Sequence, residues 1–203
     1  MNLTCVTPPA TPILDVDLFR NHLRIDPAND AEVVNSLPRA VSSYLDGRDG
    51  LLGRALITQT WRLTLDGFPS PACRAGPAIV LPLPPLQVVQ SITYIDPDGV
   101  QQTLQASEYV AQGIGSDDKG KIIPAFGKTW PQTQDFPGAV TVTFRAGYGD
   151  AVGAGPQAIT QAALLIAAHW FEQREAVIVG NFGARPLPIG AAELLAPYRN
   201  FGF

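Results

Sequence analysis

Apolar residues recur with two different periods along this chain, and the change of period predicts its organisation. Segments 14–26 and 29–47 carry apolar residues at the three- and four-residue spacing of amphipathic helices. After residue 54 the period becomes two, and a helical spacing returns only after residue 154. We therefore expect an α+β fold in which a helical scaffold, made of two N-terminal helices plus a long C-terminal helix, is interrupted by a β-rich insertion.

The first two helices have recognisable signals at their ends. Asp15 is the expected N-cap of the first, and Pro27 follows its end. Its expected buried side consists of Leu18, Phe19, His22 and Leu23. Asn29 or Asp30 is expected to cap the second helix, and Pro38 inside it predicts a kink or a break. Its apolar stripe consists of Val33, Val34, Leu37, Val41, Tyr44 and Leu45.

The insertion contains seven expected strands. They are 56–66, 78–82, 88–95, 100–104, 107–112, 121–123 and 139–146. In YIDPDGVQQTL the Asp98-Gly99 pair is typical of a hairpin turn. The last strand places Val140, Val142 and Phe144 on one face. The Pro-rich stretch 81–89 favours an edge or a connection over a central strand.

The two ends of the chain differ from its middle. Residues 1–12 are expected to form an extended arm, because Pro8, Pro9 and Pro12 exclude regular pairing. A Gly/Pro-rich linker near the C-terminus leads to a short helix and an aromatic tail. The expected organisation is therefore an arm at 1–12, a helical connector core at 13–53 with 154–179, a β-rich insertion at 54–150, and a linker with a C-terminal segment at 180–203.

Pro156 opens the long C-terminal helix, which is apolar on nearly every side. A helix of this kind has to be covered on every side, and one core in a chain of this length covers only about half of it. We therefore expect copies of the chain to cover the rest for one another. The expected subunit interface consists of Ile159, Ala162, Ala163, Leu165, Ile166 and Trp170.

Composition indicates an ordered chain with little surface charge, because 46% of the residues are hydrophobic and 16% are charged. We expect a partner to cover part of such a surface. The formal net charge is −4 and no run of Lys or Arg occurs, which excludes the basic footprint of a protein that grips DNA or RNA. Cys5 and Cys73 could form one disulfide, but two free thiols in a reducing compartment are favoured.

Targeting signals are not evident in the sequence. The N-terminus has no basic region and no apolar run, so no signal peptide is expected. The longest apolar run, 162–168, is too short to span a membrane. We expect a soluble chain that is intracellular when made.

The stretch GSDDKGKI at 115–122 matches the glycine and lysine spacing of a phosphate-binding loop, but other features contradict that function. Ile122 replaces the Ser or Thr that would bind magnesium, and Asp117 and Asp118 would repel phosphate. KIIP continues as a strand and not as a helix. A flexible hairpin loop is the better interpretation.

Other candidate sites are weak. His169, Glu172 and Glu175 include a single histidine, so a histidine bonded to a neighbour is favoured over a metal ligand. DPANDAE at 26–32 lacks the spacing of a calcium loop, and helix capping explains it better. Three further carboxylates, Asp66, Asp96 and Asp98, could suggest a glycosidase pair, but the last two lie in a turn.

The aromatic residues of the insertion offer one more alternative. Trp61, Trp130, Phe144 and Tyr148 could form a ligand platform, although core or subunit interface is the favoured role. Neither cysteine lies beside a histidine, and no nucleophile motif occurs. We expect no catalytic, cofactor-binding or metal-binding residues, no cofactor, and no enzymatic activity.

Six segments follow one another in an informative order: LFRNHLRID, GRALITQTWRLTLDGFP, LPLPPLQVVQSITYIDPDGV, PGAVTVTFRAGYG, AITQAALLIAAHWFEQRE and LLAPYR. Over residues 13–200 this order resembles the head–tail connector (adaptor) proteins of tailed phages and gene transfer agents. No single segment is diagnostic, whereas the six together are specific. The chain departs from the pattern at Pro38 and in the variable stretch VGNFGARPLPIG.

The resemblance implies a structural protein at the head–tail interface of a virion, assembled in the host cytoplasm. It implies a ring, typically of twelve copies, that sits beneath the portal protein and meets a tail-side stopper or tail-terminator protein. DNA would pass through the channel without specific binding, and no membrane would be involved. Residues 190–203 would reach into the portal. The expected portal-docking residues are Leu194, Leu195, Tyr198, Arg199, Phe201 and Phe203.

Two alternatives stay open at this point. The first is another structural protein of a virion tail or baseplate, which would use similar surfaces. The second is an enzyme or a carbohydrate-binding module carried on the β-rich insertion.

Overall fold

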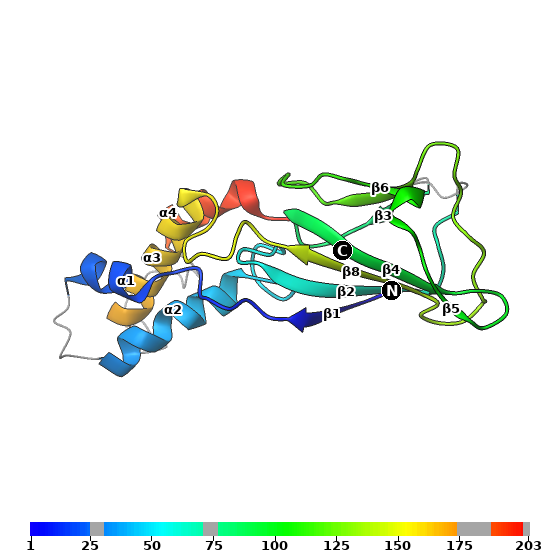
Figure 1. The fold of residues 1–203 in the computed structure, drawn as a ribbon. Coiled ribbons are helices and arrows are strands. Elements are labelled where there is room, and N and C mark those ends of the chain that lie inside the picture. The colour runs from blue at the N-terminus through cyan, green and yellow to red at the C-terminus, as the bar shows by residue number, and fades with distance from the viewer. Residues whose placement is uncertain (25–30, 71–76, 174–187, 201–203) are drawn as a thin grey trace, which may run out of the picture. The chain divides into compact units, whose positions relative to one another are not determined.

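The computed structural model describes residues 1–24, 31–70, 77–173 and 188–200. The chain divides into two compact units. Unit 1 comprises Met1–Pro9 and Thr58–Tyr148, and unit 2 comprises Ala10–Ile57 and Gly149–Phe203. The β-strands belong to unit 1 and the four α-helices to unit 2 (Figure 1), so the expected α+β class is confirmed.

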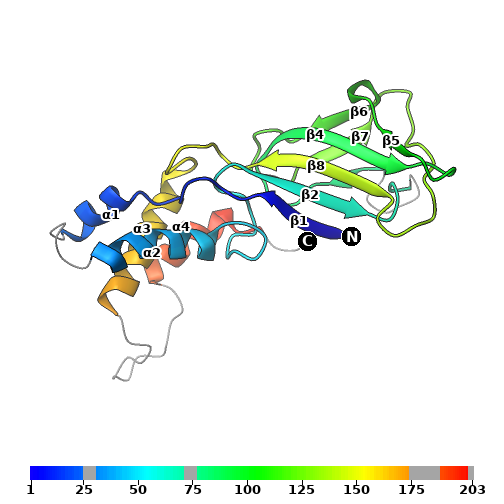
Figure 2. The same ribbon diagram turned by 60° about the horizontal axis from the view of Figure 1, so that its bottom comes forward.

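Unit 1 is built on a five-stranded antiparallel sheet with the order β1-β2-β8-β4-β5. These strands are β1 (Asn2–Thr7), β2 (Gln59–Leu65), β8 (Val140–Ala146), β4 (Leu86–Ile95) and β5 (Gln101–Thr103). Figure 2 shows β1, β2, β8 and β4 side by side in this order. The last strand in the sequence, β8, lies between β2 and β4, so the centre of the sheet joins early and late parts of the chain.

A smaller three-stranded sheet has the order β3-β7-β6. It consists of β3 (Ile79–Val80), β7 (Lys121–Pro124) and β6 (Tyr109–Gln112), and a 3-10 turn, η1 (Ala106–Glu108), precedes β6. Each of the seven expected strand segments overlaps one strand of the two sheets, although β4 begins before the expected segment 88–95 and β7 ends after 121–123, so the period-two pattern is confirmed. Within the Pro-rich stretch 81–89, residues 81–85 are a connection, in agreement with their prolines, but residues 86–89 belong to β4, which has β8 on one side and β5 on the other, so the expected edge or connection is wrong for that part.

Alternation along the central strands forms the core of unit 1. Val140, Val142 and Phe144 of β8 are fully buried, as the sequence predicts. In the β2–β8 register Leu63 lies opposite Val142 and Trp61 lies opposite Phe144, and both β2 residues are also buried. These cross-strand pairs are the unit of sheet stability, and they place one face of the sheet in the core.

The N-terminal arm is not free of regular pairing. Strand β1 pairs with β2 in an antiparallel register, so the expectation that the prolines exclude pairing is wrong for Asn2–Thr7. The strand ends directly before Pro8, where the missing N–H would interrupt the ladder. The prolines therefore end this strand and do not prevent it.

Unit 2 contains the helices α1 (Val16–Leu23), α2 (Ala31–Leu45), α3 (Gln157–Glu172) and α4 (Ile189–Leu195), and the 3-10 turn η2 (Ala196–Tyr198). The chain leaves unit 2 after Ile57 and re-enters it at Gly149, and these two residues form a parallel β-bridge. Unit 1 thus begins and ends at neighbouring points of unit 2, apart from the N-terminal strand.

The cap of α1 is confirmed, but its expected buried side is only partly correct. One Asp15 carboxylate oxygen accepts hydrogen bonds from the Asp17 and Leu18 amides, at 2.8 and 2.9 Å. Phe19 is buried and meets Phe171 edge to face. Leu18 and His22 are exposed, so both assignments to the buried side are wrong. In so short a helix a single bulky anchor, here Phe19, sets which side faces the core.

The expected break at Pro38 is wrong, because α2 is one continuous helix through that residue. Buried Val34, Val41 and Leu45 hold the helix to the core on both sides of the proline. The Ser42 hydroxyl donates to the Pro38 carbonyl at 2.7 Å and accepts the Ile13 amide at 2.9 Å. Packing therefore offsets the hydrogen bond that Pro38 lacks. The expected caps, Asn29 and Asp30, lie outside the described residues.

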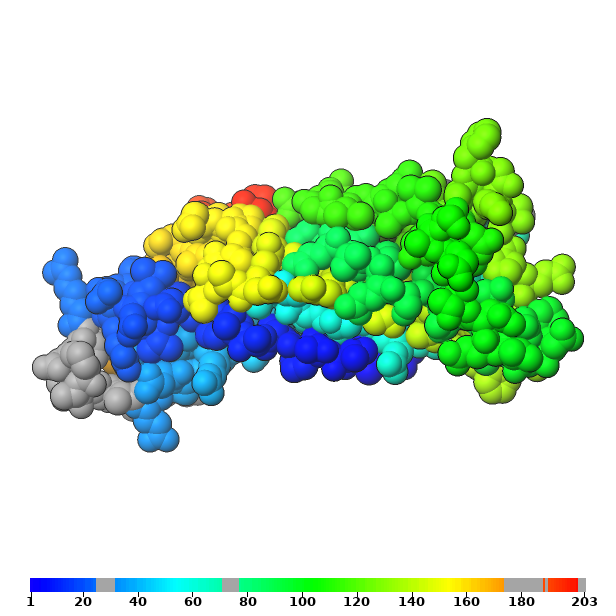
Figure 3. All heavy atoms as spheres, viewed as in Figure 1, coloured from blue at the N-terminus to red at the C-terminus, as the bar shows by residue number. Residues whose placement is uncertain are grey.

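The β4–β5 hairpin has the expected turn, with Gly99 at a φ of 82°. The Asp96 carboxylate accepts the Asp98 and Val100 amides and the Gln102 side-chain amide. These bonds favour the ionised carboxylate, and the Gln102 bond is the largest cause of a lowered Asp96 pKa. The hairpin lies at the molecular surface, in green in Figure 3.

We predict that Gln102→Ala raises the pKa of Asp96 towards its ordinary value, because the variant loses the main bond to the carboxylate. The contribution of this bond to stability is present above the unfolded-state pKa and is lost as the pH falls through the lowered folded-state pKa. Titration of the Asp96 side-chain carboxyl by NMR measures the shift, with Gln101→Ala as the control. An unchanged pKa in Gln102→Ala would contradict this account.

Candidate functional site

Helix α3 carries the expected subunit interface, and unit 2 itself covers most of it. Helices α1, α2 and α4 all pack against α3. The buried residues of α3 are Ile159, Thr160, Ala162, Ala163, Leu164, Ile166 and Ala167. The premise that the chain cannot cover this helix alone is therefore wrong for the first three turns. The apolar pattern gave no indication that α4 also packs against α3, so the expected burial of α3 was too low.

Two of the expected interface residues on α3 are only half-buried. Trp170 is half-buried and meets Tyr44 of α2 edge to face, with ring centroids 5.5 Å apart. Leu165 is also half-buried, and a Cβ on Gly190 of α4 would lie 3.7 Å from its Cδ1 atom. Of the six expected interface residues, these two retain surface that a neighbouring copy could contact. The interface itself stays a prediction.

The C-terminal segment, expected to dock on the portal, is bound to its own unit as far as residue 200. The Arg54 Nε–H donates to the Tyr198 carbonyl at 2.7 Å, and the guanidinium lies 5.8 Å from the centre of the Tyr198 ring. The Asn200 amide donates to the Leu52 carbonyl at 2.9 Å, and its side-chain amide donates to the Gly53 carbonyl at 3.4 Å. We call Leu52, Gly53 and Arg54 the C-terminal socket.

This arrangement divides the expected docking residues. Leu195 belongs to the core of unit 2 with 1% of its surface exposed, so it is not available to a partner. Leu194 and Tyr198 are half-buried, and Arg199 is exposed. Phe201 and Phe203 lie outside the described residues. Docking by the exposed members of this group stays a prediction.

Sequence reasoning missed the socket because Gly53 and Arg54 lie where the helical spacing ends, and no contact was expected for either residue. The signal was present: Arg54 is the one charged residue in the apolar run LLGRALI. Arg54 is 3% exposed. A buried guanidinium needs hydrogen-bond partners nearby, and here residues more than a hundred positions away supply them.

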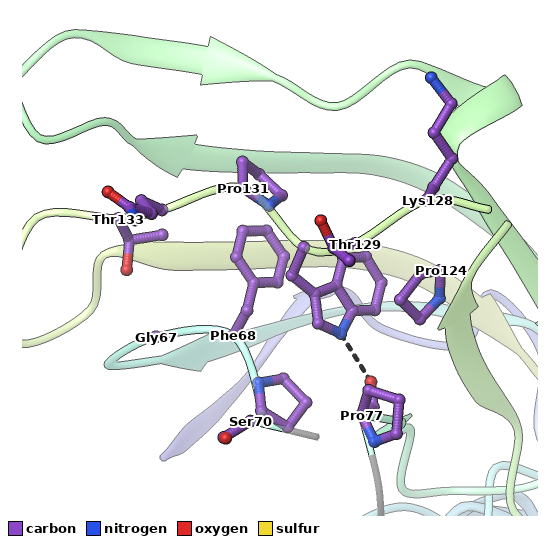
Figure 4. Close-up of a pocket in the computed structure, with 12 residues that line it drawn as sticks. Gly67, Phe68, Ser70, Pro77, Pro124, Lys128, Thr129, Pro131 and Thr133 are labelled. Carbon is purple, nitrogen blue, oxygen red and sulfur yellow. Dashed lines mark hydrogen bonds between the residues drawn. The ribbon is translucent and has the colours of Figure 1, made fainter. Parts of the chain in front are cut away.

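Unit 1 contains a hollow of about 440 Å³ beside a stacked aromatic pair. The Phe68 and Trp130 rings lie nearly parallel with centroids 4.8 Å apart, and Tyr94 meets Phe68 edge to face. The Trp130 indole N–H donates to the Pro77 carbonyl at 2.6 Å. In Figure 4 the Phe68 ring points toward Pro131 and away from Ser70, and the dashed line marks the bond to Pro77.

The four aromatic residues expected as a platform or as core have separate roles. Trp61 and Phe144 are core residues, opposite each other on β2 and β8. Trp130 lines the hollow, where stacking with Phe68 occupies one face of its ring. The Tyr148 hydroxyl bonds to the Asp117 carboxylate. They do not form one platform.

The weaker motifs have structural roles. Residues 115–122 join β6 to β7 in an antiparallel hairpin, which confirms the loop interpretation. Asp66 accepts the Gly138 amide, and Asp96 organises its own turn. Within the described ranges, no group of three His, Cys, Asp or Glu side chains could hold a metal ion. Cys73 and Glu175 fall in undescribed segments.

The length and apolar character of the helices decide whether one of them could span a membrane. No helix in the described parts of the chain is both long and apolar enough to cross a bilayer.

Comparison with known proteins links the whole chain to one kind of particle. No family model matches the sequence, and no curated protein matches it. A solved structure called virion of native gene transfer agent (GTA) particle contains a similar chain, with 27% identity and a TM-score of 0.73. Two similar chains come from the neck of an empty GTA particle computed with C6 symmetry (27%, 0.71) and the neck of a native GTA particle computed with C12 symmetry (28%, 0.70). Each match covers 100% of this chain and 97% of the other.

We predict that Ala163→Leu destabilises the isolated chain by about 1–3 kcal/mol, because Ala163 is fully buried within unit 2 and has no room for a larger side chain. Denaturant unfolding at several protein concentrations measures the change. Gln161→Leu, on the exposed side of the same helix, is the control and changes stability by less than about 0.5 kcal/mol. A neutral Ala163→Leu would mean that this face of α3 is not packed by its own chain.

Proposed function

We propose that this chain is a structural head–tail adaptor of a phage or gene-transfer-agent particle. It forms a ring beneath the portal, joins the portal to the tail, and leaves a channel for DNA passage. The observation that carries the proposal is the match over the full chain to components of GTA particles, two of them solved as necks. The described residues supply packing and hydrogen-bond roles for the candidate catalytic groups, which also favours a structural protein.

A ring of about twelve copies is supported by the C12 symmetry used for one neck structure. A closed ring needs two different contact surfaces on each copy, because every copy meets its neighbours head to tail. Leu165 and Trp170 of α3 offer partly exposed apolar surface in unit 2. In unit 1 the large exposed apolar side chains include Ile114, Phe126 and Phe136.

Phe126 is the most exposed of these side chains, and the turn that carries it is well held. The Lys128 amide donates to the Ala125 carbonyl, and the Ala125 amide donates to the Glu108 carbonyl, both at 2.9 Å. Phe126 is therefore presented to solvent on an ordered turn. Large apolar side chains in this setting are typical of contact surfaces, and we include Phe126 among the surfaces covered in the assembled particle.

The net negative charge of the chain is compatible with a channel through which DNA passes. A net charge of −4 lacks the cationic surface that would hold phosphates by releasing counterions, so DNA can slide past without specific binding. The partners of the ring are the portal on the head side and a stopper or tail-terminator protein on the tail side. Arg199 and the terminal phenylalanines are the residues we assign to portal docking.

We predict that the purified chain, mixed with the portal protein of its own particle, forms rings on the portal that electron microscopy detects. Class averages would place the chain directly against the portal. Direct contact with tail proteins alone would instead favour a tail or baseplate component. A chain that stays monomeric in both samples, and whose tryptophan fluorescence changes with added glycans, would favour a carbohydrate-binding module that uses the Phe68–Trp130 hollow.

We predict that removal of residues 201–203 weakens portal capture, because it deletes Phe201 and Phe203, and leaves the folded chain intact, because it retains the bonds of Tyr198 and Asn200 to the socket. Removal of residues 197–203 is a different experiment. It deletes Tyr198, whose carbonyl accepts a hydrogen bond from buried Arg54, and lowers the free energy of unfolding by about 1–3 kcal/mol. Pull-down with portal and thermal unfolding separate the two effects. Full portal capture by the shorter deletion would contradict the docking assignment.

A further inference from the structure

The C-terminal socket is fixed to the end of helix α2 by backbone hydrogen bonds. The Leu51 amide donates to the Tyr44 carbonyl at 2.8 Å, and the Leu52 amide donates to the Leu45 carbonyl at 3.3 Å. The Gly47 amide donates to the Arg54 carbonyl at 2.8 Å. The socket therefore moves with α2 as one body, and a segment bound to it inherits that position.

The carboxylate of Asp46 completes this support from the other side. It accepts the Leu56 amide at 2.7 Å, so the chain is held both before and after Arg54. A segment pinned at both ends has few alternative conformations, and its carbonyl groups point in fixed directions. The carbonyl oxygens of Leu52 and Gly53 accept the hydrogen bonds from Asn200.

Gly53 meets two conditions that only glycine satisfies. Its φ is +60°, a region that disfavours residues with a side chain. A Cβ atom at this position would lie 2.8 Å from the Asn200 carbonyl oxygen, which is too close for a real contact. The absence of a side chain is what allows residue 200 to lie against the socket.

Arg54 holds the same segment two residues earlier. Its side chain is almost fully buried, and burial of a charge is unfavourable unless polar partners replace water. The Tyr198 carbonyl and ring supply part of this replacement. The contact is thus reciprocal, because the segment covers the guanidinium and the guanidinium orients the segment.

We propose that Gly53 and Arg54 are positioning residues that lock Tyr198–Asn200 onto unit 2, so that residues 201–203 start from the same point in every copy of a ring. The proposal rests on the adaptor function, since it explains how one docking segment per copy is aligned for the portal. An anchored segment loses less conformational entropy on docking than a free tail, which strengthens binding without any new contact.

The first experiment measures hydrogen exchange of the Asn200 amide in the full chain, without any partner. Gly53→Ala is expected to increase its exchange rate about tenfold or more, because backbone strain and the collision with Asn200 both oppose the bond to Leu52. The matched control is Gly153→Ala. Gly153 has a φ of +72°, and a Cβ added there would meet no atom within 4 Å, so this variant has the strain without the collision.

The second experiment replaces Arg54. Arg54→Met removes the donor to Tyr198 and is expected to speed exchange at Asn200 about fivefold or more, whereas Arg54→Lys keeps a cationic donor and restores part of the protection. Exchange of the α3 amides in the same samples reports whether the fold is intact. Arg39→Met, at an exposed arginine of α2, is the control.

The outcomes separate the lock from the adaptor function. Faster exchange at Asn200 with unchanged α3 protection supports the lock, and unchanged exchange at Asn200 in both folded variants overturns it. Ring formation on the portal is then measured with the same proteins. A normal lock in a chain that never binds portal would overturn the adaptor function alone, whereas normal portal capture by an unlocked variant would overturn the alignment role.

Discussion

Unit 2 depends on the burial of helix α3 by the other helices. Most sides of this helix are apolar, apart from the exposed side with Gln157 and Gln161, and such a helix is stable only when neighbours cover its apolar sides. Helices α1 and α2 precede most of unit 1 in the sequence, and α4 follows α3. The cover therefore brings together parts of the chain that are far apart in sequence. The meeting of Arg54 with Tyr198 is a consequence, because α2 and α4 both pack against α3.

The chain leaves unit 2 and returns to it at two residues that contact each other. The chain departs at Ile57 and returns at Gly149, and these two residues form a bridge within unit 2. A long excursion between neighbouring points has only a modest closure entropy, because this cost grows slowly with length. The fold thus separates two tasks: the helices hold the chain to itself, and the sheets provide additional surface with its own core.

Local pattern was enough to predict most elements, and long-range packing decided the rest. The strands around Val142 and the cap at Asp15 follow from alternation and side-chain chemistry close in sequence. The continuity of α2 through Pro38 depends on contacts that no local window contains. The same holds for the candidate site: the apolar character of α3 was visible, but its cover by α4 and the burial of Arg54 are tertiary facts.

The bond between Asn200 and Leu52 also sets an order of events during synthesis. Every residue of unit 1 has been made once the ribosome passes Tyr148, so that unit can fold while translation continues. Unit 2 cannot be completed until α4 and Asn200 have been made, and until then α3 is uncovered on the side that α4 will occupy. A nascent chain in this state exposes apolar surface of α3, which is the kind of surface that leads to aggregation and that chaperones protect.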